Sequence, residues 1–427
     1  MAVRYTRPRG TQDVLPAQSG QWLRLEKLLR DTVSLYGYKE IRLPTFEATE
    51  VFARGVGDTT DIVSKEMYTF LDKGGRSITL RPEGTAGVAR AVLENGLLGS
   101  APIPLKAYYL QSCFRYEKAQ KGRLREFHQL GIECFGAADA AADAEVIAVA
   151  DQILRRAGIR QVRLEINSIG CRECRPRYHA ALRDYFGARR GELCADCQAR
   201  LERNPMRLLD CKVERCRQIA QGAPVILDYI CEGCRRHFAQ VKDTLAAQGI
   251  DFVVNPAIVR GLDYYSNTVF EFIHTAVGTQ GTICGGGRYD GLVEEFDGPA
   301  TPAVGFGMGI ERLLLAAEAE QADLGRDRPP VLYLASLGEE GKRQAAVLAA
   351  QLRGAGLYVE YDIVGRGLKA QMKYANKLGA VYSMVLGDDE VAAGRAELKR
   401  MEDGQTRSVA FSELAGALGG EQACGCR

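Results

Sequence analysis

The chain has 427 residues, of which 46% are hydrophobic and 26% charged, and its formal net charge is +2. This composition excludes a disordered, collagen-like or coiled-coil chain, and the length suggests about three compact units. No apolar run is long enough for a spanning helix, and the polar N-terminal segment lacks the apolar stretch of a secretory signal. We therefore expect a cytoplasmic protein without a membrane partner, in which any nucleic-acid surface is local.

The first part of the chain alternates between helix and strand patterns. Residues 20–36 carry apolar residues at helical spacing and predict a helix that ends at Gly37. A strand beside Pro44 and a second helix are predicted next. Between Ser77 and Glu133, the segments SITLRPEGT, KAYYLQSCFRYE and FHQLGIECFG predict strands, and GTAGVARAVLENG predicts a helix.

Residues 171–255 have a different character, because they are rich in Cys and Arg and contain only short helical patterns. We interpret them as a mainly helical insertion, since strand patterns resume after them in VFEFIH and TICGGG. TPAVGFGMGIERLLLAAEAE then predicts a strand, a turn and a helix. After a charged, Pro-containing linker at 326–330, residues 331–427 predict a small α/β domain with a mostly parallel sheet.

Three arginine-bearing segments are the candidates for phosphate binding. The chain has no P-loop and no nucleophile elbow, and GFGMGI lacks the last glycine and the βαβ unit of a dinucleotide site. Arginine side chains would then have to hold the phosphates of any nucleotide. The candidates are Arg115 in FRYEKAQKGRLRE, Arg260 in VRGLDYY and Arg312 in MGIERLLL. Alone, the Arg115 and Arg312 segments also fit exposed basic surfaces. A half-buried strand edge would explain the tyrosines of the Arg260 segment, but not its Arg-Gly-Leu-Asp pairing.

The order of the motifs is more specific than any one of them. LPTFE, FRYE and GFGMGIERL resemble, in that order, the three signature motifs of class II aminoacyl-tRNA synthetases. Within that class, RPRGTQDVLP, LRPEGT, FHQLGIE, RGLDYY and GGGRYDGL resemble the histidyl-tRNA synthetases, and the resemblance covers nearly the whole chain. It implies an α+β catalytic domain over 1–325, built on an antiparallel sheet flanked by helices and interrupted by the Cys-rich insertion. It also implies that 331–427 form an anticodon-binding α/β domain.

The resemblance implies a histidine–tRNA ligase. Such an enzyme joins L-histidine to ATP, giving histidyl-adenylate and pyrophosphate, and then transfers the histidyl group to the 3′ end of tRNA(His). Mg²⁺ is expected with the ATP, and the family is homodimeric through its first motif. By resemblance, Arg115 and Arg260 would act at the α-phosphate, and Arg123 and Arg312 would bind the terminal phosphate.

Recognition of histidine is assigned by the same resemblance. Its α-ammonium would contact Glu83, Thr85 and Gln129, and its imidazole would contact Glu133 and Tyr265. Tyr264 is a further candidate that also fits a packed aromatic residue, and the two glutamates also fit structural ion pairs. The neighbouring His128 should point to the opposite face of its strand, as a packed or hydrogen-bonded histidine.

Exposed lysines are the candidates for tRNA contacts. Lys118 and Lys121 lie in the basic loop that would meet the acceptor stem. This loop has Lys118-Ala119 and Leu124 where many relatives have Arg-Pro and an aromatic residue, a difference that concerns its tRNA contacts and not the chemistry. In the C-terminal domain, Lys369, Lys373 and Lys377 fall on one helical stripe. A solvated helix face would explain that stripe equally well.

Other functions that share this fold fit the sequence less well. A catalytically inactive regulatory subunit of histidine biosynthesis should lack the phosphate arginines and the anticodon domain. A prolyl or threonyl enzyme would not carry RGLDYY and GGGRYDG, and a pseudo-synthetase module of a kinase would need further domains.

Eight of the thirteen cysteines lie between Cys171 and Cys234. Four cysteines, in Cys171-x₂-Cys174 and Cys194-x₂-Cys197, match a tetrathiolate zinc spacing, and Cys211-x₄-Cys216 with Cys231-x₂-Cys234 form a looser second set. Four thiolates leave no open position on zinc, so the site would be structural. The spacing leaves open whether one or two ions bind, which cysteines share an ion, or whether all eight are reduced thiols.

Overall fold

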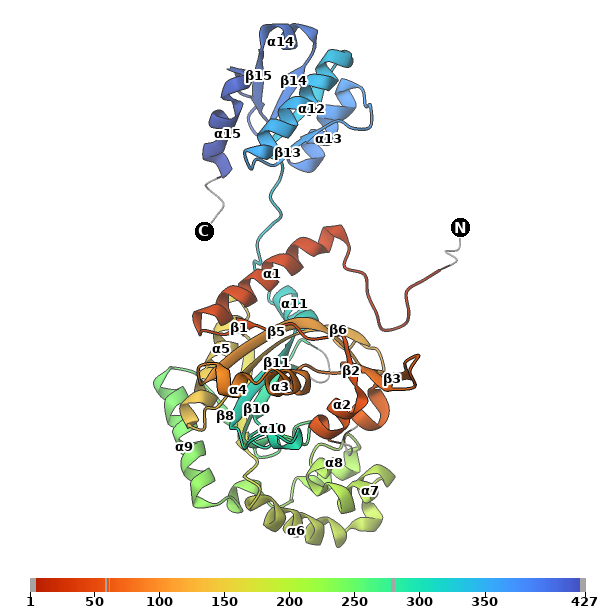
Figure 1. Ribbon diagram of the computed structural model, residues 1–427, viewed down its shortest axis with the longest axis vertical. Helices are drawn as coiled ribbons and strands as arrows, with labels where there is room; N and C mark the ends of the chain where they lie inside the picture. Colours follow the sequence, from red (N-terminus) through yellow and green to blue (C-terminus); the bar gives the residue numbers. More distant parts are fainter. Residues whose placement is uncertain (1–4, 58–59, 61, 278–280, 423–427) are drawn as a thin grey trace. The chain divides into compact units, whose positions relative to one another are not determined.

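The computed structural model describes residues 5–57, 60, 62–277 and 281–422. The chain divides into two compact units, Met1–Gly325 and Arg326–Arg427. Each unit has its own sheet (Figure 1). Each also has its own apolar core.

The first unit is built on an eight-stranded sheet. Its two edge pairs are parallel and the pairings between them are antiparallel, so the predicted antiparallel sheet is confirmed. The strands in spatial order are β1 (Lys39–Glu40), β5 (Leu105–Phe114), β6 (Glu126–Phe135), β11 (Ala303–Gly309), β10 (Thr282–Arg288), β9 (Ser266–His274), β7 (Val162–Ser168) and β8 (Val253–Val254).

Helices cover this sheet and bury its apolar side chains. The long helix α1 (Pro16–Leu35) begins with a proline, which suits a first helical turn, and ends just before Gly37, as predicted. Helices α1, α5 (Ala140–Arg156) and α9 (Glu232–Ala247) pack in sequence, and α11 (Ile310–Ala319) packs on β6. The buried faces of these helices join the strands in one large apolar cluster.

A smaller sheet and short helices extend the unit beside α3 (Thr85–Glu94), the helix predicted in GTAGVARAVLENG. The strand predicted beside Pro44 is interrupted, because residues 41–45 lie between β1 and the short strand β2. The added elements are β2 (Phe46–Ala48), β4 (Ser77–Leu80) and β3 (Tyr68–Leu71) in one sheet, with α2 (Thr49–Val56), the π-helical turn η1 (Ile62–Glu66), α4 (Leu97–Ser100) and α10 (Leu292–Glu295).

The insertion between β7 and β8 is mainly helical, as predicted. It shares a buried apolar cluster with the sheet unit, in which Tyr178 and Leu182 belong together with Tyr265 and Tyr289. The insertion therefore shares an apolar core with the sheet of the first unit. Its elements are α6 (Cys174–Gly187), η2 (Arg190–Glu192), α7 (Ala195–Arg203), η3 (Pro205–Leu208), α8 (Glu214–Ala220), η4 (Ile226–Asp228) and α9.

The second unit has a five-stranded sheet in the order β13-β12-β14-β15-β16. The prediction of a mostly parallel sheet is wrong for its last part, because β15 and β16 pair antiparallel. Gly394 ends the short helix α14 in a left-handed conformation. The following strand, β15, then runs back antiparallel along β14. The elements are β12 (Leu332–Ser336), α12 (Gly338–Gly354), β13 (Val359–Tyr361), α13 (Leu368–Leu378), β14 (Tyr382–Leu386), α14 (Asp388–Ala393), β15 (Arg395–Arg400), β16 (Thr406–Ala410), η5 (Phe411–Glu413) and α15 (Leu414–Gln422).

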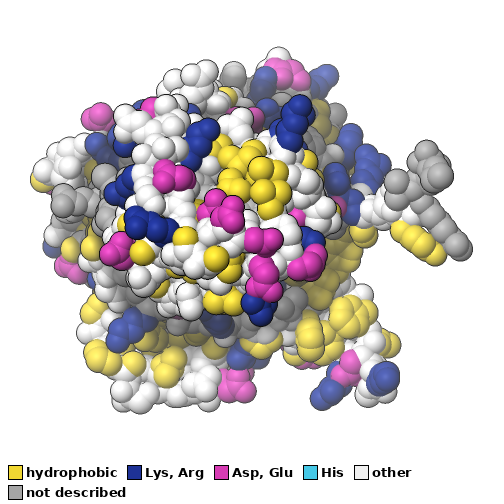
Figure 2. Space-filling view, turned by 90° about the horizontal axis from the view of Figure 1, so that it is seen from above, with side chains coloured by type: hydrophobic (Ala, Val, Ile, Leu, Met, Phe, Trp, Pro, Cys, Tyr) yellow, Lys and Arg dark blue, Asp and Glu magenta, His cyan; other side chains and the backbone are white. Residues whose placement is uncertain are grey.

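Basic and acidic side chains are interspersed on the face drawn in Figure 2, with apolar patches between them. This distribution agrees with the small net charge of the sequence. Across the described part of the chain, no helix has the length and apolar character needed to cross a bilayer.

Candidate active site

One pocket in the first unit gathers side chains that lie up to 229 positions apart in the sequence, from Glu83 to Arg312. The lining residues come from the β4–α3 turn and the start of α3, from β5, the β5–β6 loop and β6, from the loop before β9, and from β10, β11 and α11. The predicted residues that line the pocket are Glu83, Thr85, Arg115, Arg123, Gln129, Arg260, Tyr264, Tyr265 and Arg312.

Two of the arginines are oriented by contacts near the β5–β6 loop. Arg115 Nε donates a hydrogen bond to the carbonyl of Pro82 at 2.8 Å. The Arg123 guanidinium lies 2.9 Å from the carboxylate of Glu117. Arg115 Nη1 also lies 3.8 Å from the Glu117 carboxylate, so two arginines share one carboxylate and the loop presents positive charge that is already positioned.

Arg312, near the start of α11, joins this loop to the sheet. Its Nε donates to the carbonyl of Gly122 at 2.9 Å, and its Nη1 donates to the carbonyl of Thr282. Burial lowers the pKa of Arg312, and the charge of Arg123 lowers it further. Two like charges held at one end of the pocket favour an anionic ligand there.

Arg260 enters the pocket from the loop before β9. It forms an ion pair with Glu271 of β9, and its guanidinium lies 5.3 Å from the centre of the Tyr265 ring. A side chain at Gly285 would collide with the Arg260 guanidinium. The glycine in GGGRYDGL therefore leaves the space that Arg260 occupies.

Another part of the pocket wall is formed by uncharged polar groups and a buried carboxylate. Glu83 accepts hydrogen bonds from the backbone N–H groups of Thr85 (2.6 Å) and Ala86 (2.9 Å), the first residues of α3. Burial raises the pKa of Glu83, while these hydrogen bonds act in the opposite direction. The carboxylate is thus fixed at a helix N-terminus, where a negative charge is favourable.

Glu133 lies behind the pocket and not among its lining residues. It is fully buried, and its carboxylate accepts hydrogen bonds from Thr85 Oγ1 at 2.7 Å and from the hydroxyl of Tyr289. Burial raises the pKa of Glu133 to about 8. Sequence reasoning assigned no role to Tyr289, although its motif GGGRYDGL was already singled out.

Two tyrosines and one glutamine complete this wall. The rings of Tyr264 and Tyr265 are 4.7 Å apart, and Tyr264 also lies edge-on to Tyr289 at 5.6 Å. Gln129 pairs with Gly309 in the sheet, and its side-chain amide lies over Gly307, where any side chain would collide with it. The glycines of β10 and β11 therefore make room for the longer polar side chains of their neighbours.

His128 points away from this wall, as predicted. Its Nδ1 lies 2.9 Å from Glu311, and its ring meets Trp22 edge-on at 5.0 Å. The hydrogen bond to Glu311 raises the pKa of His128. We therefore interpret this histidine as structural.

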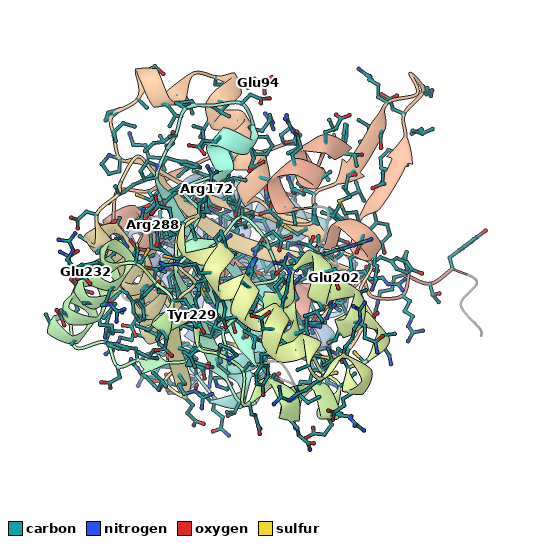
Figure 3. All side chains as sticks on the ribbon, turned by 90° about the horizontal axis from the view of Figure 1, so that it is seen from below. Glu94, Arg172, Glu202, Tyr229, Glu232 and Arg288 are labelled. Atoms are coloured by element: carbon teal, nitrogen blue, oxygen red, sulfur yellow. The ribbon has the colours of Figure 1, made fainter. Side chains whose placement is uncertain are left out.

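A buried ion pair connects the end of β10 to the insertion. Arg288, labelled in Figure 3, pairs with Asp143 of α5, and His237 Nε2 of α9 lies 3.2 Å from the same carboxylate. The pKa of Asp143 is lowered: the His237 and Arg288 contacts outweigh the opposing effect of burial. The strand that leads to Tyr289 is thereby tied to α5 and α9.

The candidate tRNA-binding lysines are exposed but lie in different parts of the chain. Lys118 and Lys121 are in the β5–β6 loop of the first unit. Lys369, Lys373 and Lys377 are exposed on α13 of the second unit.

The eight cysteines form two separate groups of four. In each group the sulfur atoms lie within 4.8 Å of one another. The pairing is nested, which corrects the grouping favoured by the sequence spacing. The outer cluster comprises Cys171, Cys174, Cys231 and Cys234, and the inner cluster comprises Cys194, Cys197, Cys211 and Cys216.

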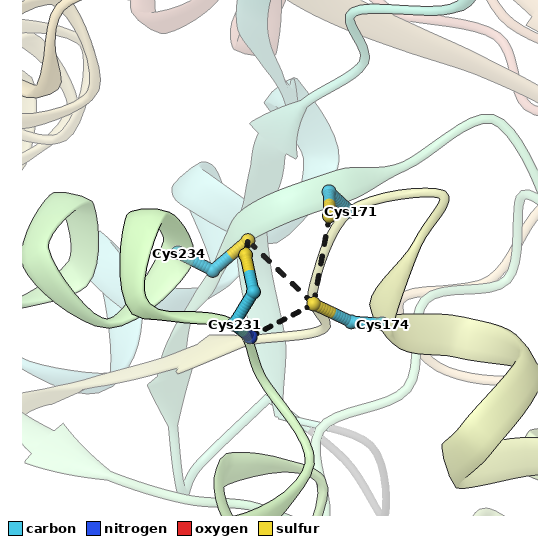
Figure 4. A group of neighbouring side chains, drawn as sticks. All are labelled: Cys171, Cys174, Cys231 and Cys234. Carbon is cyan, nitrogen blue, oxygen red and sulfur yellow. Dashed lines mark hydrogen bonds between the residues drawn. The ribbon is translucent and has the colours of Figure 1, made fainter.

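The outer cluster joins the two ends of the insertion (Figure 4). Neighbouring Sγ atoms in it are 3.5 to 3.9 Å apart. A disulfide needs about 2.05 Å, whereas four sulfurs at about 2.3 Å from zinc lie about 3.8 Å apart. The backbone N–H of Cys231 also donates to Cys174 Sγ at 3.0 Å. This arrangement suits a tetrahedral thiolate site.

The antiparallel sheet with arginines at its strand ends, and a separate α/β unit after it, define a class II aminoacyl-tRNA synthetase. A family model described as "Histidyl-tRNA synthetase" matches residues 10–173 and 206–313, and one described as "Anticodon binding domain" matches residues 332–420. The chain belongs to the histidyl-tRNA synthetase family.

Similar proteins cover almost the whole chain. It is 51% identical to the histidine–tRNA ligase of Caldanaerobacter subterraneus subsp. tengcongensis, over 96% of this chain and 98% of that one. It is 50% identical to the histidine–tRNA ligase of Acetivibrio thermocellus, with the same coverage. The crystal structure of apo S. aureus histidyl-tRNA synthetase superposes with a TM-score of 0.83 at 39% identity, over 97% of this chain and 99% of that one.

Proposed function

We propose that the protein is a histidine–tRNA ligase, which activates L-histidine with ATP and transfers the histidyl group to the 3′ end of tRNA(His). The observation that carries this proposal is the composition of one pocket. Four arginines, Arg115, Arg123, Arg260 and Arg312, line it together with the polar wall around Glu83 and Tyr265. The same pocket would then hold the phosphates of ATP and the ammonium group of histidine.

In the activation step, the histidine carboxylate attacks the α-phosphorus of ATP and pyrophosphate leaves. Negative charge builds on the phosphate oxygens, so fixed cations lower the barrier. Arg115 and Arg260 would stabilise the α-phosphate, and Arg123 and Arg312 would bind the terminal phosphate. No general base is required, because the attacking carboxylate is already ionised.

Mg²⁺ would accompany the ATP and neutralise phosphate charge. Glu117 and Glu311 line the same pocket, and carboxylate oxygens are the ligands that Mg²⁺ prefers, with phosphates and water completing its shell.

Histidine would bind along the part of the pocket wall that carries Glu83 and Tyr265. Glu83, Thr85 and Gln129 would hold its ammonium group, and Tyr265, with Tyr264 beside it, would face its imidazole. Glu133, expected from the resemblance to contact the imidazole, lies behind the wall and contacts Thr85 directly, so it would act by orienting Thr85. Polar groups left unpaired by a different amino acid would penalise that amino acid by factors of about 10⁴.

A regulatory subunit without catalysis is the second candidate, and the pocket speaks against it. Such a protein has no need of four arginines aimed at one anionic ligand, and all four line the pocket here.

The second unit likewise fits tRNA binding. Lys369 and Lys373 would contact the anticodon stem, while Lys118 and Lys121 would approach the acceptor stem.

We also propose that the chain forms a homodimer. Phe46, Phe70 and Leu71 belong to the small sheet beside the LPTFE segment, and they are 55%, 48% and 70% exposed. Covering them with a second copy would remove apolar surface from water. Light scattering on the wild type and on Phe46→Glu tests this: the variant should have half the mass of the wild type, and a monomeric wild type would contradict the proposal.

The two cysteine clusters would each hold a structural zinc ion. The sulfur separations suit four Zn–S bonds, and four thiolates leave no position for a reacting water. Zinc would then stabilise the insertion directly, since metal binding contributes to the free energy of folding.

The experiment that tests the ligase proposal is tRNA charging. The protein should attach radiolabelled histidine to a tRNA(His) transcript, and it should leave a tRNA(Pro) transcript uncharged with either histidine or proline. Charging with proline, or no charging at all by folded protein, would contradict the proposal.

A further inference from the structure

The loop that carries Arg260 is held in place by the insertion. Arg207, in η3, donates one guanidinium hydrogen bond to the carbonyl of Arg260 and another to the carbonyl of Gly261, each at 3.2 Å. Because the guanidinium is a rigid planar fork, these two bonds fix the direction of two successive peptide groups.

A second contact holds the Arg260 loop at Asp263, two residues further along the chain. Asn204 Nδ2 donates to the carboxylate of Asp263 at 3.0 Å. On the other side, the backbone N–H of Asp263 donates to the carbonyl of Val56 at 3.2 Å, and a Cβ at Gly57 would lie 2.8 Å from the Asp263 carboxylate. The loop is therefore held between the insertion and α2, with little space to shift.

The segment that carries Asn204 and Arg207 is itself packed into the core beside the pocket. Met206 and Leu208 are buried and belong to the same apolar cluster as Ile258 and Tyr265. Tyr265 lines the pocket directly. A movement of η3 would thus disturb both the backbone that carries Arg260 and the wall next to it.

The inner cysteine cluster lies on both sides of this segment in the chain. Cys197 precedes Asn204, and Cys211 follows Leu208. The Sγ atoms of Cys194 and Cys211 are 3.9 Å apart, and the backbone N–H of Cys194 donates to Cys216 Sγ at 3.2 Å. An ion bound by these sulfurs would fix both ends of the segment that carries Asn204 and Arg207.

We infer that Asn204 and Arg207 are positioning residues for histidine activation, and that a metal ion in the inner cluster braces them against the Arg260 loop. This inference rests on the proposed ligase function. Neither residue reaches the reacting atoms. They act through the placement of Arg260, and a misplacement of about 1 Å can reduce the rate of a reaction about 10²-fold.

The first test is kinetic. Arg207→Ala should lower the kcat of histidine-dependent ATP–pyrophosphate exchange by about 10- to 100-fold, with smaller changes in the KM values of histidine and ATP and with an unchanged zinc content. Arg207→Lys should be intermediate, because one ammonium reaches one carbonyl. Arg190→Ala is the matched control, since Arg190 lies in the same insertion and contacts Glu202 at the surface. A wild-type kcat in Arg207→Ala would overturn the inference.

The second test asks whether the metal acts through the same contacts. Cys211→Ser should lose one zinc ion and lower kcat, and the double variant with Arg207→Ala should lose little more than either single variant, because both changes release the same loop. If Cys211→Ser does not fold, withdrawal of zinc by a chelator from the wild type and from Arg207→Ala completes the same cycle. If the kcat losses of the two single variants multiplied in the double variant, the metal and Arg207 would act independently, and the inference that the metal braces this loop would be overturned. Absence of histidine-dependent exchange in the wild type would instead contradict the proposed function.

Discussion

The hydroxyl of Tyr289 donates a hydrogen bond to the buried carboxylate of Glu133. The two residues are 156 positions apart and lie in two of the motifs that resemble this family. The same carboxylate accepts a hydrogen bond from Thr85, which lines the pocket. The three side chains thus form a hydrogen-bonded network in which Thr85, part of the pocket wall, is held by the Glu133 carboxylate, which is buried from water.

This network predicts a pH dependence of stability. The folded protein keeps the proton of Glu133 up to a pKa of about 8, whereas the unfolded chain loses it near the ordinary value of 4.5. Between these pH values the folded state holds more protons, so the free energy of unfolding falls as pH rises. Glu133→Gln removes this dependence, and its stability relative to wild type should improve by roughly 1 kcal/mol for each pH unit from 5 to 8.

Urea unfolding at several pH values measures this difference. Glu94→Gln is the control, because Glu94 is exposed and pairs with Arg90 at the surface. A constant difference between Glu133→Gln and wild type across this pH range would contradict the prediction.

Replacement of Arg260 should damage chemistry more than binding. Arg260→Ala removes a charge that acts mainly when the phosphate oxygens gain negative charge, and the adenylation rate should fall about 10²- to 10³-fold. Single-turnover adenylate formation measures the rate, and calorimetry measures histidine affinity, which should change much less. Arg163→Ala is the control, since Arg163 is exposed on β7 and pairs with Glu165. An adenylation rate near that of wild type would make Arg260 structural.

How far the sequence predicts this site depends on which interactions place each residue. Arg115 directly follows β5 and Thr85 begins α3, and both belong to short motifs, FRYE and LRPEGT, whose resemblance to the family assigns their roles. Tyr289 acquires its role only when β10 lies near β6, which no local pattern shows. The cysteine pairing stays open in the sequence for a similar reason. Spacing along the chain matches neighbouring pairs best, whereas Cys171 and Cys231 meet because both ends of the insertion return to the same sheet.

The hairpin β15–β16 shows a further limit. Only Ala396 and Leu398 of β15 are buried, and its other residues are exposed and mostly charged. The hydrophobic pattern is therefore weak, and the parallel arrangement of β12, β13 and β14 gives no sign that the next strand runs the other way.

Removal of the second unit should separate the two halves of the reaction. The first unit has its own core and contains the whole pocket. A protein that ends at Gly325 should still form histidyl-adenylate but lose nearly all tRNA charging. Undiminished charging would show that the second unit is not needed to bind tRNA.

The lysines of α13 give a milder version of that test. Lys369→Ala and Lys373→Ala should each weaken tRNA binding and reduce the slope of log K against log salt by about 1, because each variant neutralises one phosphate fewer. Histidine-dependent exchange should not change. Glu397→Ala on β15 is a control for the surface of the same unit, and an unchanged salt slope in both lysine variants would leave α13 a solvated face.

Metal analysis tests the cysteine clusters. Protein purified under reducing conditions without chelator should contain two zinc ions, one for each cluster. A chelator should lower the unfolding temperature, because bound metal contributes to folding free energy. A content below about 0.2 zinc per chain, with all eight cluster thiols reacting quickly in the folded protein, would contradict the metal sites.

The most direct measurement of the central claim is ATP–pyrophosphate exchange with each of the common amino acids in turn. The pocket joins phosphate-binding arginines to a polar wall that suits histidine, so histidine alone should support rapid exchange. Exchange with proline or threonine but not with histidine, by folded protein with its metal content intact, would contradict the assignment.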